Sequence, residues 1–504
     1  MLSEAEIKRF IDEDAASEKK RQAAIGQRYY EAEHDILDMR LFFYNADGVL
    51  TEDKTRSNVK ISHPFFTELS DQLVSYVLSF KDNPVRANEG VEGLQKQLDT
   101  YFDEQFWDEM AELVGGAYNK GFDYMYAYKN EEDRIAFQYA DGTGVIEVRA
   151  KDTDDNCEYV IYWYIDRIDK GQKLIKRIQV WDDKQVYYFV QVDNGDVKKD
   201  DGEKINPKPH TLYKSEDKEE ITYENFGFIP FWRLDNNRKQ ISGLKPVKAI
   251  IDDYDIHACS LSNNLIDFDT PLHVVRGFNG DNLDELQQNI KTKKMIGVDE
   301  GGGVEVHTVD IPYQARQQKL TLDEVDIYRF GMGFNSSQAG DGNITNVVIR
   351  SRYALLDLKG GRMKSRIKRF LKKLLKVVIA EINDKEGTDY QVSDVYFDFT
   401  SEITTNETEN IQNDLTKAQT QQVKVTTIMN VAAVVGDEQV LKAICEQLDW
   451  DYQEIKIQVE KLKAEAAEQQ LAAAKAALEG AVADDEPIPA GAEPLDNPGG
   501  QLAI

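Results

Sequence analysis

The sequence has little cysteine, a deficit of positive charge and no long apolar run. Its 504 residues include three cysteines, Cys157, Cys259 and Cys445, which lie far apart and form no CxxC pair. Scarce, scattered cysteines favour a reducing compartment and argue against a disulfide scaffold or a zinc site. No stretch approaches the roughly 18 apolar residues that a bilayer-spanning helix needs, and the charged N-terminus lacks a signal-peptide pattern. We therefore expect no membrane association.

The charge balance is strongly acidic. Lysine and arginine number 61 against 91 aspartate and glutamate residues, which gives a formal net charge of -30. A protein that grips duplex DNA neutralises phosphates with clustered basic side chains. The composition therefore predicts that nucleic acid is either not a partner or a partner that slides past without being held.

Motifs for catalysis or cofactor binding are also missing. The six histidines are scattered, with no pair at metal-ligand spacing, and neither a GxxxxGK[ST] loop nor a GxSxG elbow occurs. Gly331 and Gly333 lack the third glycine of a dinucleotide turn, and the acidic runs 152–155 and 252–253 lack EF-hand spacing. We expect no catalytic residue, no metal and no cofactor, so the chain is not predicted to be an enzyme. An α+β hydrolase is the alternative from another class.

Hydrophobic periodicity predicts helices in the first 120 or so residues. Apolar residues recur at spacings of three and four within 27–41, 63–80 and 91–118, and Ser3 is placed to cap an earlier helix. Asp47-Gly48 predicts a turn between two of these helices.

From Phe122 to about Leu234 the apolar period changes to two, in short runs rich in aromatic and β-branched residues. Turn residues separate the runs at 141–142, 170–171 and 194–195. This pattern predicts one predominantly antiparallel sheet. Together with the preceding helices, it gives an α+β fold class.

The segment 246–330 predicts a small module between two long helices. One helix runs from Pro246 to Phe268 and the other from Pro312 to Phe330. Between them we expect a strand at 272–275, a helix at 282–292, and a hairpin of 295–298 and 304–309 that turns at Gly301–Gly303. Helices of roughly 20 residues are about 30 Å long. The pattern therefore predicts a projecting stalk with the module at its far end.

A glycine-rich polar loop follows the second of these helices and ends near residue 345. Compact domains rarely keep a loop of about a dozen residues without a use for it, although an ordinary surface linker has a similar composition. The polar side chains of this loop that we consider functional are Asn335, Ser336, Ser337, Gln338, Asp341, Asn343 and Thr345.

A long helix is predicted from about residue 346 to 382, with a possible kink at Gly360-Gly361. Its apolar face carries Leu356, Met363, Ile367, Phe370, Leu374 and Val378. Its opposite face carries Arg362, Arg366, Arg369, Lys373 and Lys376. In so acidic a chain, we favour contact of this basic face with an acidic neighbouring subunit. Contact with DNA phosphates and an ordinary amphipathic surface helix remain alternatives.

The remaining residues predict a short strand at 395–399, helices from Thr405 onward, and a last helix from Glu454 to about Val482. The segment 484–504 is acidic and contains proline and glycine, so we expect it to be disordered.

This order of elements resembles the portal, or head–tail connector, proteins of tailed bacteriophages, in particular the siphophage portals of Gram-positive hosts. The resemblance covers about residues 29–450, and its strongest local match is 353–359, which opens the long helix. Supporting matches are Arg28-Tyr-Tyr30, Ile229-Pro-Phe231 and the segment 251–255.

The resemblance implies a portal fold with a wing, a two-helix stem, a small α/β clip, a long kinked wing helix and a helical C-terminal crown, assembled as a ring. The implied parts are the wing (1–240), stem helices (241–268 and 312–332), clip (269–311), tunnel loop (333–345), long wing helix with returning strand (346–400), crown (401–483) and acidic tail (484–504).

The resemblance also implies a function. Such proteins form rings of about twelve identical subunits at one capsid vertex. The implied partners are the terminase large subunit, a head-completion adaptor, the major capsid and scaffolding proteins, and double-stranded DNA that passes through the channel during packaging and ejection. The implied location is the virion, and the host cytoplasm during assembly.

An acidic channel fits this function because each phosphate contact with a basic ring would trap the passing DNA. We assign Asp323, Glu324 and Asp326 of the second stem helix to the channel face. Another ring-forming virion protein, such as an adaptor or scaffold, remains the alternative.

Overall fold

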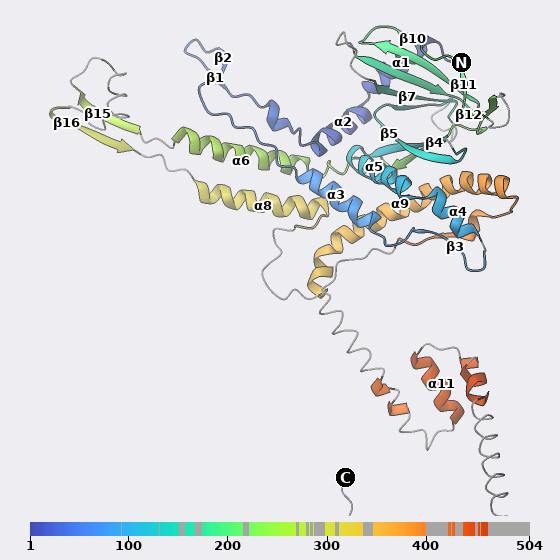
Figure 1. Cartoon of the computed structure of the whole chain (residues 1–504). Coiled ribbons are helices and arrows are strands. Elements are labelled where there is room, and N and C mark those ends of the chain that lie inside the picture. Colours follow the sequence, from blue (N-terminus) through green and yellow to red (C-terminus); the bar gives the residue numbers. More distant parts are fainter. Residues whose placement is uncertain are drawn as a thin grey trace, which may run out of the picture. The chain divides into compact units, whose positions relative to one another are not determined.

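The computed structural model places most of the chain (Figure 1). It describes residues 1–91, 93–130, 132–150, 157–166, 174–214, 221–268, 272–278, 282, 286, 298–307, 312–335, 346–399, 422–424, 426–428, 437–448, 452–453 and 455–461. The chain divides into two compact units, Met1–Thr404 and Thr405–Ile504. Of the helices placed in these ranges, none has both the length and the apolar character needed to cross a bilayer.

The N-terminal region is helical as predicted, and the predicted helix 63–80 is present with shorter bounds as α3 (Phe65–Leu78). The other helices of this region are α1 (Glu4–Ala15), α2 (Glu18–Tyr30), α4 (Leu94–Tyr101) and α5 (Glu104–Lys120). Ser3 caps α1 as predicted: its Oγ accepts from the Glu6 backbone, and the Glu6 carboxylate accepts from the Ser3 backbone.

Two of the predicted helix spans are wrong. The span 27–41 fails because α2 ends at Tyr30, where Ala32 adopts a left-handed φ of 58° that no helix can continue. Only a short 3₁₀ turn, η1 (Asp35–Asp38), follows. The span 91–118 is two helices, because Asp103 leaves helical geometry and caps α5.

A hairpin replaces the predicted turn between helices. Strands β1 (Phe42–Tyr44) and β2 (Leu50–Glu52) pair antiparallel on either side of Asp47-Gly48. The Asn45 side-chain oxygen accepts from the backbone of Asp47 and of Val49, and Gly48 has a positive φ of 74°. The turn is therefore the connection of a hairpin that the apolar pattern had not revealed.

The strand region is antiparallel as predicted, but the prediction of a single sheet is wrong. A 3-stranded sheet has the order β14-β4-β5, and a 6-stranded sheet has the order β10-β9-β8-β7-β6 with β11 beside β9. The first contains β4 (Phe122–Lys129), β5 (Ile135–Ala140) and β14 (Phe231–Asp235). The second contains β6 (Val145–Val148), β7 (Tyr159–Ile165), β8 (Ile175–Trp181), β9 (Gln185–Val192), β10 (Val197–Lys199) and β11 (Lys208–Pro209). A further strand pair is β12 (Thr211–Lys214) with β13 (Ile221–Glu224).

The two sheets pack against different helices and share a third core with each other. Met125 of β4 packs with α3, α5 and α9 in the main core, whereas Ile7 and Ile11 of α1 pack against Ile161 and Ile178 of the larger sheet. Each sheet therefore has its own helical cover, which a pattern of alternating residues does not specify.

Two helices with a strand pair between them form the predicted projection. These are α6 (Lys248–Phe268), β15 (Leu272–Phe278), β16 (Val298–His307) and α8 (Tyr313–Gly331). The two helices run side by side in opposite directions (Figure 1), and Lys319 of α8 pairs with Asp253 of α6. We call α6 and α8 the helix pair.

The predicted hairpin turn at Gly301–Gly303 is wrong. All three glycines lie inside β16, and Gly303 stands opposite Arg276 of β15. The backbone of 298–307 pairs with β15 instead of folding back on itself. The predicted helix at 282–292, apart from Asn282 and Leu286, and most of the first predicted hairpin strand lie outside the described residues.

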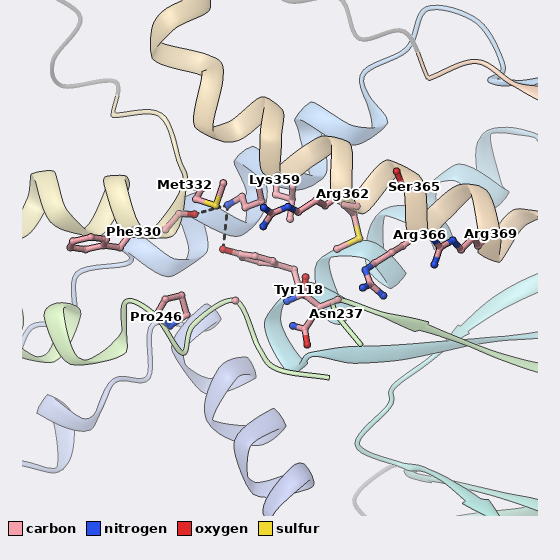
Figure 2. Close-up of a pocket in the computed structure, with 15 residues that line it drawn as sticks. Tyr118, Asn237, Pro246, Phe330, Met332, Lys359, Arg362, Ser365, Arg366 and Arg369 are labelled. Carbon is pink, nitrogen blue, oxygen red and sulfur yellow. Dashed lines mark hydrogen bonds between the residues drawn. The ribbon is translucent and has the colours of Figure 1, made fainter. Parts of the chain in front are cut away.

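The predicted long helix is α9 (Asn346–Glu386). Its predicted apolar face is buried in the main core: Leu356, Met363, Ile367, Phe370, Leu374 and Val378. The helix axis changes direction close to Lys359 (Figure 2), and a Cβ on Gly360 would lie 2.6 Å from a ring carbon of Tyr76. Glycine at this position therefore allows α9 to approach α3 closely.

A returning strand completes the first unit. After the 3₁₀ turn η4 (Val392–Asp394), strand β17 (Val395–Phe397) pairs with β3 (Val85–Ala87). In the second unit, α11 (Asp437–Leu448) is described, and the Glu438 carboxylate accepts from Tyr452 and Lys456. Of the predicted helix 454–482, residues 455–461 are described and are helical, and the predicted tail lies outside the described residues.

Candidate functional site: a basic pocket where the helix pair meets the core

A pocket of about 520 Å³ opens where α8 ends and α9 changes direction (Figure 2). We call it the basic pocket, because its charged lining residues are Lys359, Arg362, Arg366 and Arg369. Its other walls include Tyr118, Asn236, Asn237, Pro246 and Phe330. No carboxylate is among the lining residues, although the chain as a whole is acidic.

The helical repeat places the four cations. Positions 359, 362, 366 and 369 fall on one face of α9, because residues three and four apart lie above one another. Ile367 and Phe370, which do not line the pocket, hold another face of α9 in the core. Within the described part of the chain, no ion pair involves Arg362, Arg366 or Arg369, so their charge is available to an anion from outside.

Lys359 joins α9 to the end of α8. Its Nζ donates to the Gly331 carbonyl at 3.0 Å, to the Tyr118 hydroxyl at 3.2 Å and to the Leu69 carbonyl at 3.4 Å. Burial lowers the pKa of Lys359 to about 7. The ammonium therefore caps the carbonyl end of α8 although no carboxylate is close enough to compensate its burial.

Lys359→Met is expected to change how stability depends on pH. A lysine whose pKa is lowered on folding binds its proton more tightly in the unfolded chain, so the wild-type free energy of unfolding rises with pH between about 7 and 10.5. Lys359→Met removes this rise, which amounts to about 1.4 kcal/mol for each unit by which the pKa is lowered. Denaturant unfolding of both proteins at pH 7 and pH 9.5 measures the difference. Identical slopes for both proteins would show that Lys359 titrates normally.

The predicted loop begins beside the basic pocket. Phe334 stacks on Tyr353 with 4.6 Å between ring centres, and its backbone exchanges two hydrogen bonds with the Gln72 side chain. Asn335 donates to the Glu324 carboxylate at 3.0 Å. The other predicted loop residues lie outside the described residues: Ser336, Ser337, Gln338, Asp341, Asn343 and Thr345.

The assignment of Asp323 to a channel face is wrong. Its side chain is buried, with the residue 4% exposed, because this face of α8 packs on α6 and Lys319 bridges Asp323 to Asp253. Glu324 and Asp326 are partly exposed and remain candidates for that face.

The structure brings together only part of the predicted basic face. Arg362, Arg366 and Arg369 line the basic pocket, whereas Lys373 and Lys376 lie farther along α9 beside Trp232. Lys359 completes the basic pocket and was missed, since a single lysine in a helix carries no signal of its burial.

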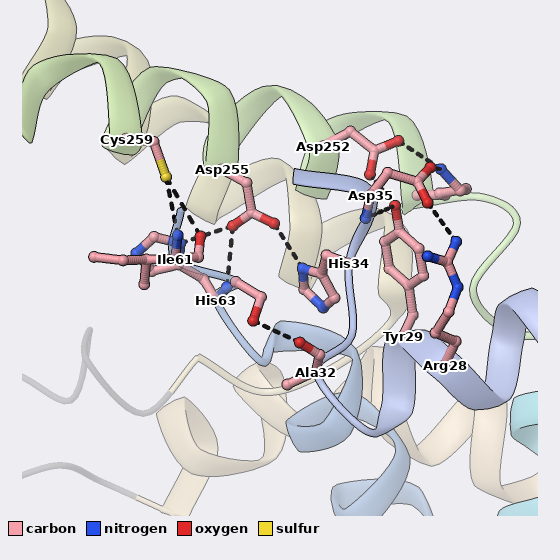
Figure 3. A network of polar contacts seen from close by, with 12 residues as sticks. Arg28, Tyr29, Ala32, His34, Asp35, Ile61, His63, Asp252, Asp255 and Cys259 are labelled. Carbon is pink, nitrogen blue, oxygen red and sulfur yellow. Dashed lines mark hydrogen bonds and ion pairs between the residues drawn. The ribbon is translucent and has the colours of Figure 1, made fainter. Parts of the chain in front are cut away.

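A second polar cluster holds α6 to the N-terminal segment (Figure 3). The buried Asp255 carboxylate contacts His34 Nδ1 at 2.6 Å and His63 Nδ1 at 2.7 Å, and accepts from the His63 backbone at 3.0 Å. Burial alone would raise the pKa of Asp255, but the hydrogen bonds from His34 and His63 hold it below its ordinary value. The cluster therefore fixes the base of α6 and has a structural role.

Comparisons with known proteins agree on one family. A family model described as "Phage portal protein, SPP1 Gp6-like" matches residues 10–470. The portal protein of Bacillus phage SPP1 is 26% identical over 344 residues, which are 68% of this chain and 66% of that protein, slightly under two thirds of its length. The portal protein of Clostridium phage phiCD119 is 25% identical over 399 residues, covering 74% of this chain and 81% of that protein.

A solved structure titled "Neck of native GTA particle computed with C12 symmetry" contains a chain that is similar to this one. One of its chains matches at 11% identity with a TM-score of 0.35, covering 71% of this chain and 86% of that chain. The family assignment rests on the sequence matches, which extend from α1 into the C-terminal unit. The chain belongs to the phage portal protein family of the SPP1 Gp6-like type.

Proposed function

We propose that this chain is the subunit of a portal ring that forms the DNA channel at one capsid vertex. The observation that carries the proposal is the helix pair, which leaves the main core as a projection inside a chain matched to the portal family over residues 10–470. Repeated around an axis, such projections wall a central passage. In this role the chain acts structurally, without catalysing a reaction.

The proposal assigns a part to each region. The wing is 1–240 and 346–400, the stem is the helix pair, the clip is 269–311, the tunnel loop is 333–345 and the crown is 401–483. The clip is the docking surface for the terminase large subunit and later for the adaptor. The ring also nucleates the procapsid with the capsid and scaffolding proteins, and it remains in the virion for ejection.

The basic pocket is proposed as a contact between subunits. A second copy of a chain with a net charge of -30 has an excess of carboxylates over basic side chains. The arginines of the basic pocket lie outside the helix pair and form no ion pair with an acidic side chain in the described part of the chain. Oppositely charged surfaces guide and orient association, so an acidic segment of the adjacent subunit is the proposed occupant.

The acidic residues of the stem are proposed to lower friction on DNA. Glu324→Lys with Asp326→Lys places cations at two partly exposed positions of α8, where each phosphate contact would add affinity. We expect the rate of DNA packaging in vitro to fall several-fold while rings still form. Glu13→Lys, on the exposed surface of α1, changes the charge without facing a channel and serves as the control. Packaging at the wild-type rate in the stem variant would contradict the proposal that these acidic residues lower friction on DNA.

Native mass spectrometry of the purified chain tests the proposed function. A portal subunit gives closed rings of about twelve copies. A hydrolase would remain monomeric or dimeric. A portal subunit is present both in particles before packaging and in filled particles. An adaptor would be absent before packaging, and a scaffold protein would be absent from filled particles, so the protein content of the two kinds of particle separates these alternatives.

A further inference from the structure

Residues 53–64, which we call the strap, bind along α6 through a regular series of hydrogen bonds. Asp255 accepts from the His63 backbone at 3.0 Å, Cys259 Sγ from Ile61 at 3.3 Å, Asn263 from Val59 at 2.7 Å and Asp267 from Ser57 at 3.1 Å. Figure 3 shows the first two of these contacts beside His34. Every second residue of the strap is therefore bound to every fourth residue of α6.

This series follows from the geometry of the two segments. Four helical residues rise about 6 Å, and two extended residues span about 6.6 Å. An extended chain laid along a helix thus meets a side chain of the same face at every second residue. The strap is fixed to α6 over several turns, and it holds the preceding hairpin β1–β2 beside the helix pair (Figure 1).

The hairpin that the strap holds has an exposed apolar surface. Tyr44 is 73% and Leu50 is 55% exposed, and these two residues are directly opposite each other. Glu52 lies on the same face, whereas Phe43 and Thr51 lie on the other. An isolated two-stranded hairpin is only marginally stable in water. No residue of β1 or β2 belongs to the described core clusters. The hairpin therefore lacks a partner surface within the described chain.

A matching surface lies on α8. Leu322 is 56% and Val325 is 37% exposed, and Arg329 is exposed on the same helical face. The strap and hairpin lie on one side of α6 and α8 on the other (Figure 1), so the hairpin and α8 are separate parts of one chain. A cation beside apolar residues on α8 complements an anion beside apolar residues on the hairpin.

We propose that the hairpin of one subunit docks on the exposed face of α8 in the next subunit. Tyr44 and Leu50 pack against Leu322 and Val325 of the neighbour, and Glu52 pairs with the neighbour's equivalent of Arg329. A contact between two different surfaces of the same chain is a head-to-tail contact. It closes into a ring when the rotation that relates adjacent subunits is a whole fraction of a full turn. The inference rests on the proposed function, since it specifies how adjacent stems are joined.

Cross-linking tests the contact. Leu50→Cys and Leu322→Cys in one chain are expected to give a ladder of covalent multimers after mild oxidation of assembled rings, visible on a non-reducing gel. Each single-cysteine variant is the control, because Cys259 and Cys445 are buried, Cys157 is partly buried, and all three are present throughout. The double variant should react and the single variants should stay monomeric on the gel.

A pair of matched variants tests the same contact without cysteine. Tyr44→Asp with Leu50→Asp is expected to reduce the ring fraction at least tenfold at a fixed protein concentration, with an unchanged unfolding transition. Thr51→Asp, on the other face of the same hairpin, should assemble normally. Rings of the double-cysteine variant that give no ladder, together with normal assembly of the Tyr44→Asp and Leu50→Asp variant, would overturn the inference and leave the portal proposal standing. A wild-type chain that forms no ring would instead overturn the proposed function.

Discussion

Arg362→Glu, Arg366→Glu and Arg369→Glu, made together, are expected to lower the fraction of chain in rings at least tenfold while the subunit remains folded. The three arginines line the basic pocket, and their reversal would set carboxylates against the acidic surface proposed for the neighbour. Folding should be unaffected, because the opposite face of α9 supplies the core contacts. Native mass spectrometry and light scattering measure the ring fraction.

Lys372→Glu provides the matched control. Lys372 is exposed on α9 but does not line the basic pocket, so its reversal should leave assembly close to that of the wild type. Normal rings in the triple variant would exclude the basic pocket from the subunit interface. Normal rings combined with failed packaging would assign the arginines to DNA phosphates, the alternative that the sequence leaves open.

Asp255→Ala is expected to destabilise the first unit by about 3–5 kcal/mol, the usual cost of breaking a buried ionic or hydrogen-bonded cluster. The substitution leaves His34 Nδ1 and two donors of His63 without their acceptor in the interior. It also releases one end of the strap from α6. Denaturant unfolding followed by circular dichroism gives the change in free energy of unfolding.

Asp253→Ala is the control for this measurement, because Asp253 is partly exposed and its ion pair with Lys319 should contribute less than about 1 kcal/mol. The depressed pKa of Asp255 also sets the pH dependence: the carboxylate contributes stability above its unfolded pKa, and that contribution is lost as the pH falls below about 4. Below about pH 4, the free energies of unfolding of the wild type and of Asp255→Ala should therefore become more similar. Equal effects of Asp253→Ala and Asp255→Ala would contradict the cluster's structural role.

The elements that depend on local periodicity could be predicted from the sequence. The apolar positions of α9, from Leu356 to Val378, recur at helical spacing and are buried as predicted. The strands from β4 to β9 were predicted from their apolar period of two. The helix pair was predicted from the helical spacing of its apolar residues and from the prolines that precede each helix. In each case one face of the element meets the core, so burial imposes the repeat that the sequence displays.

The elements that depend on tertiary partners could not be predicted in this way. Gly301–Gly303 has the composition of a turn, but β15 offers an unpaired edge and the glycines pair with it. Asp323 looks like a surface carboxylate until Lys319 and α6 enclose it. One signal was available and overlooked: the hydrogen-bonding residues Asp255, Cys259, Asn263 and Asp267 recur every four positions, which predicts a bound segment along α6.

Electron microscopy of the purified chain, with enough detail to place α6 and α8, tests the central claim most directly. We predict a closed ring in which the helix pair of every subunit surrounds the axial opening and α8 of one copy contacts the β1–β2 hairpin of the next. Solitary subunits, or a ring in which the helix pair lies on the outer rim away from the opening, would contradict the account.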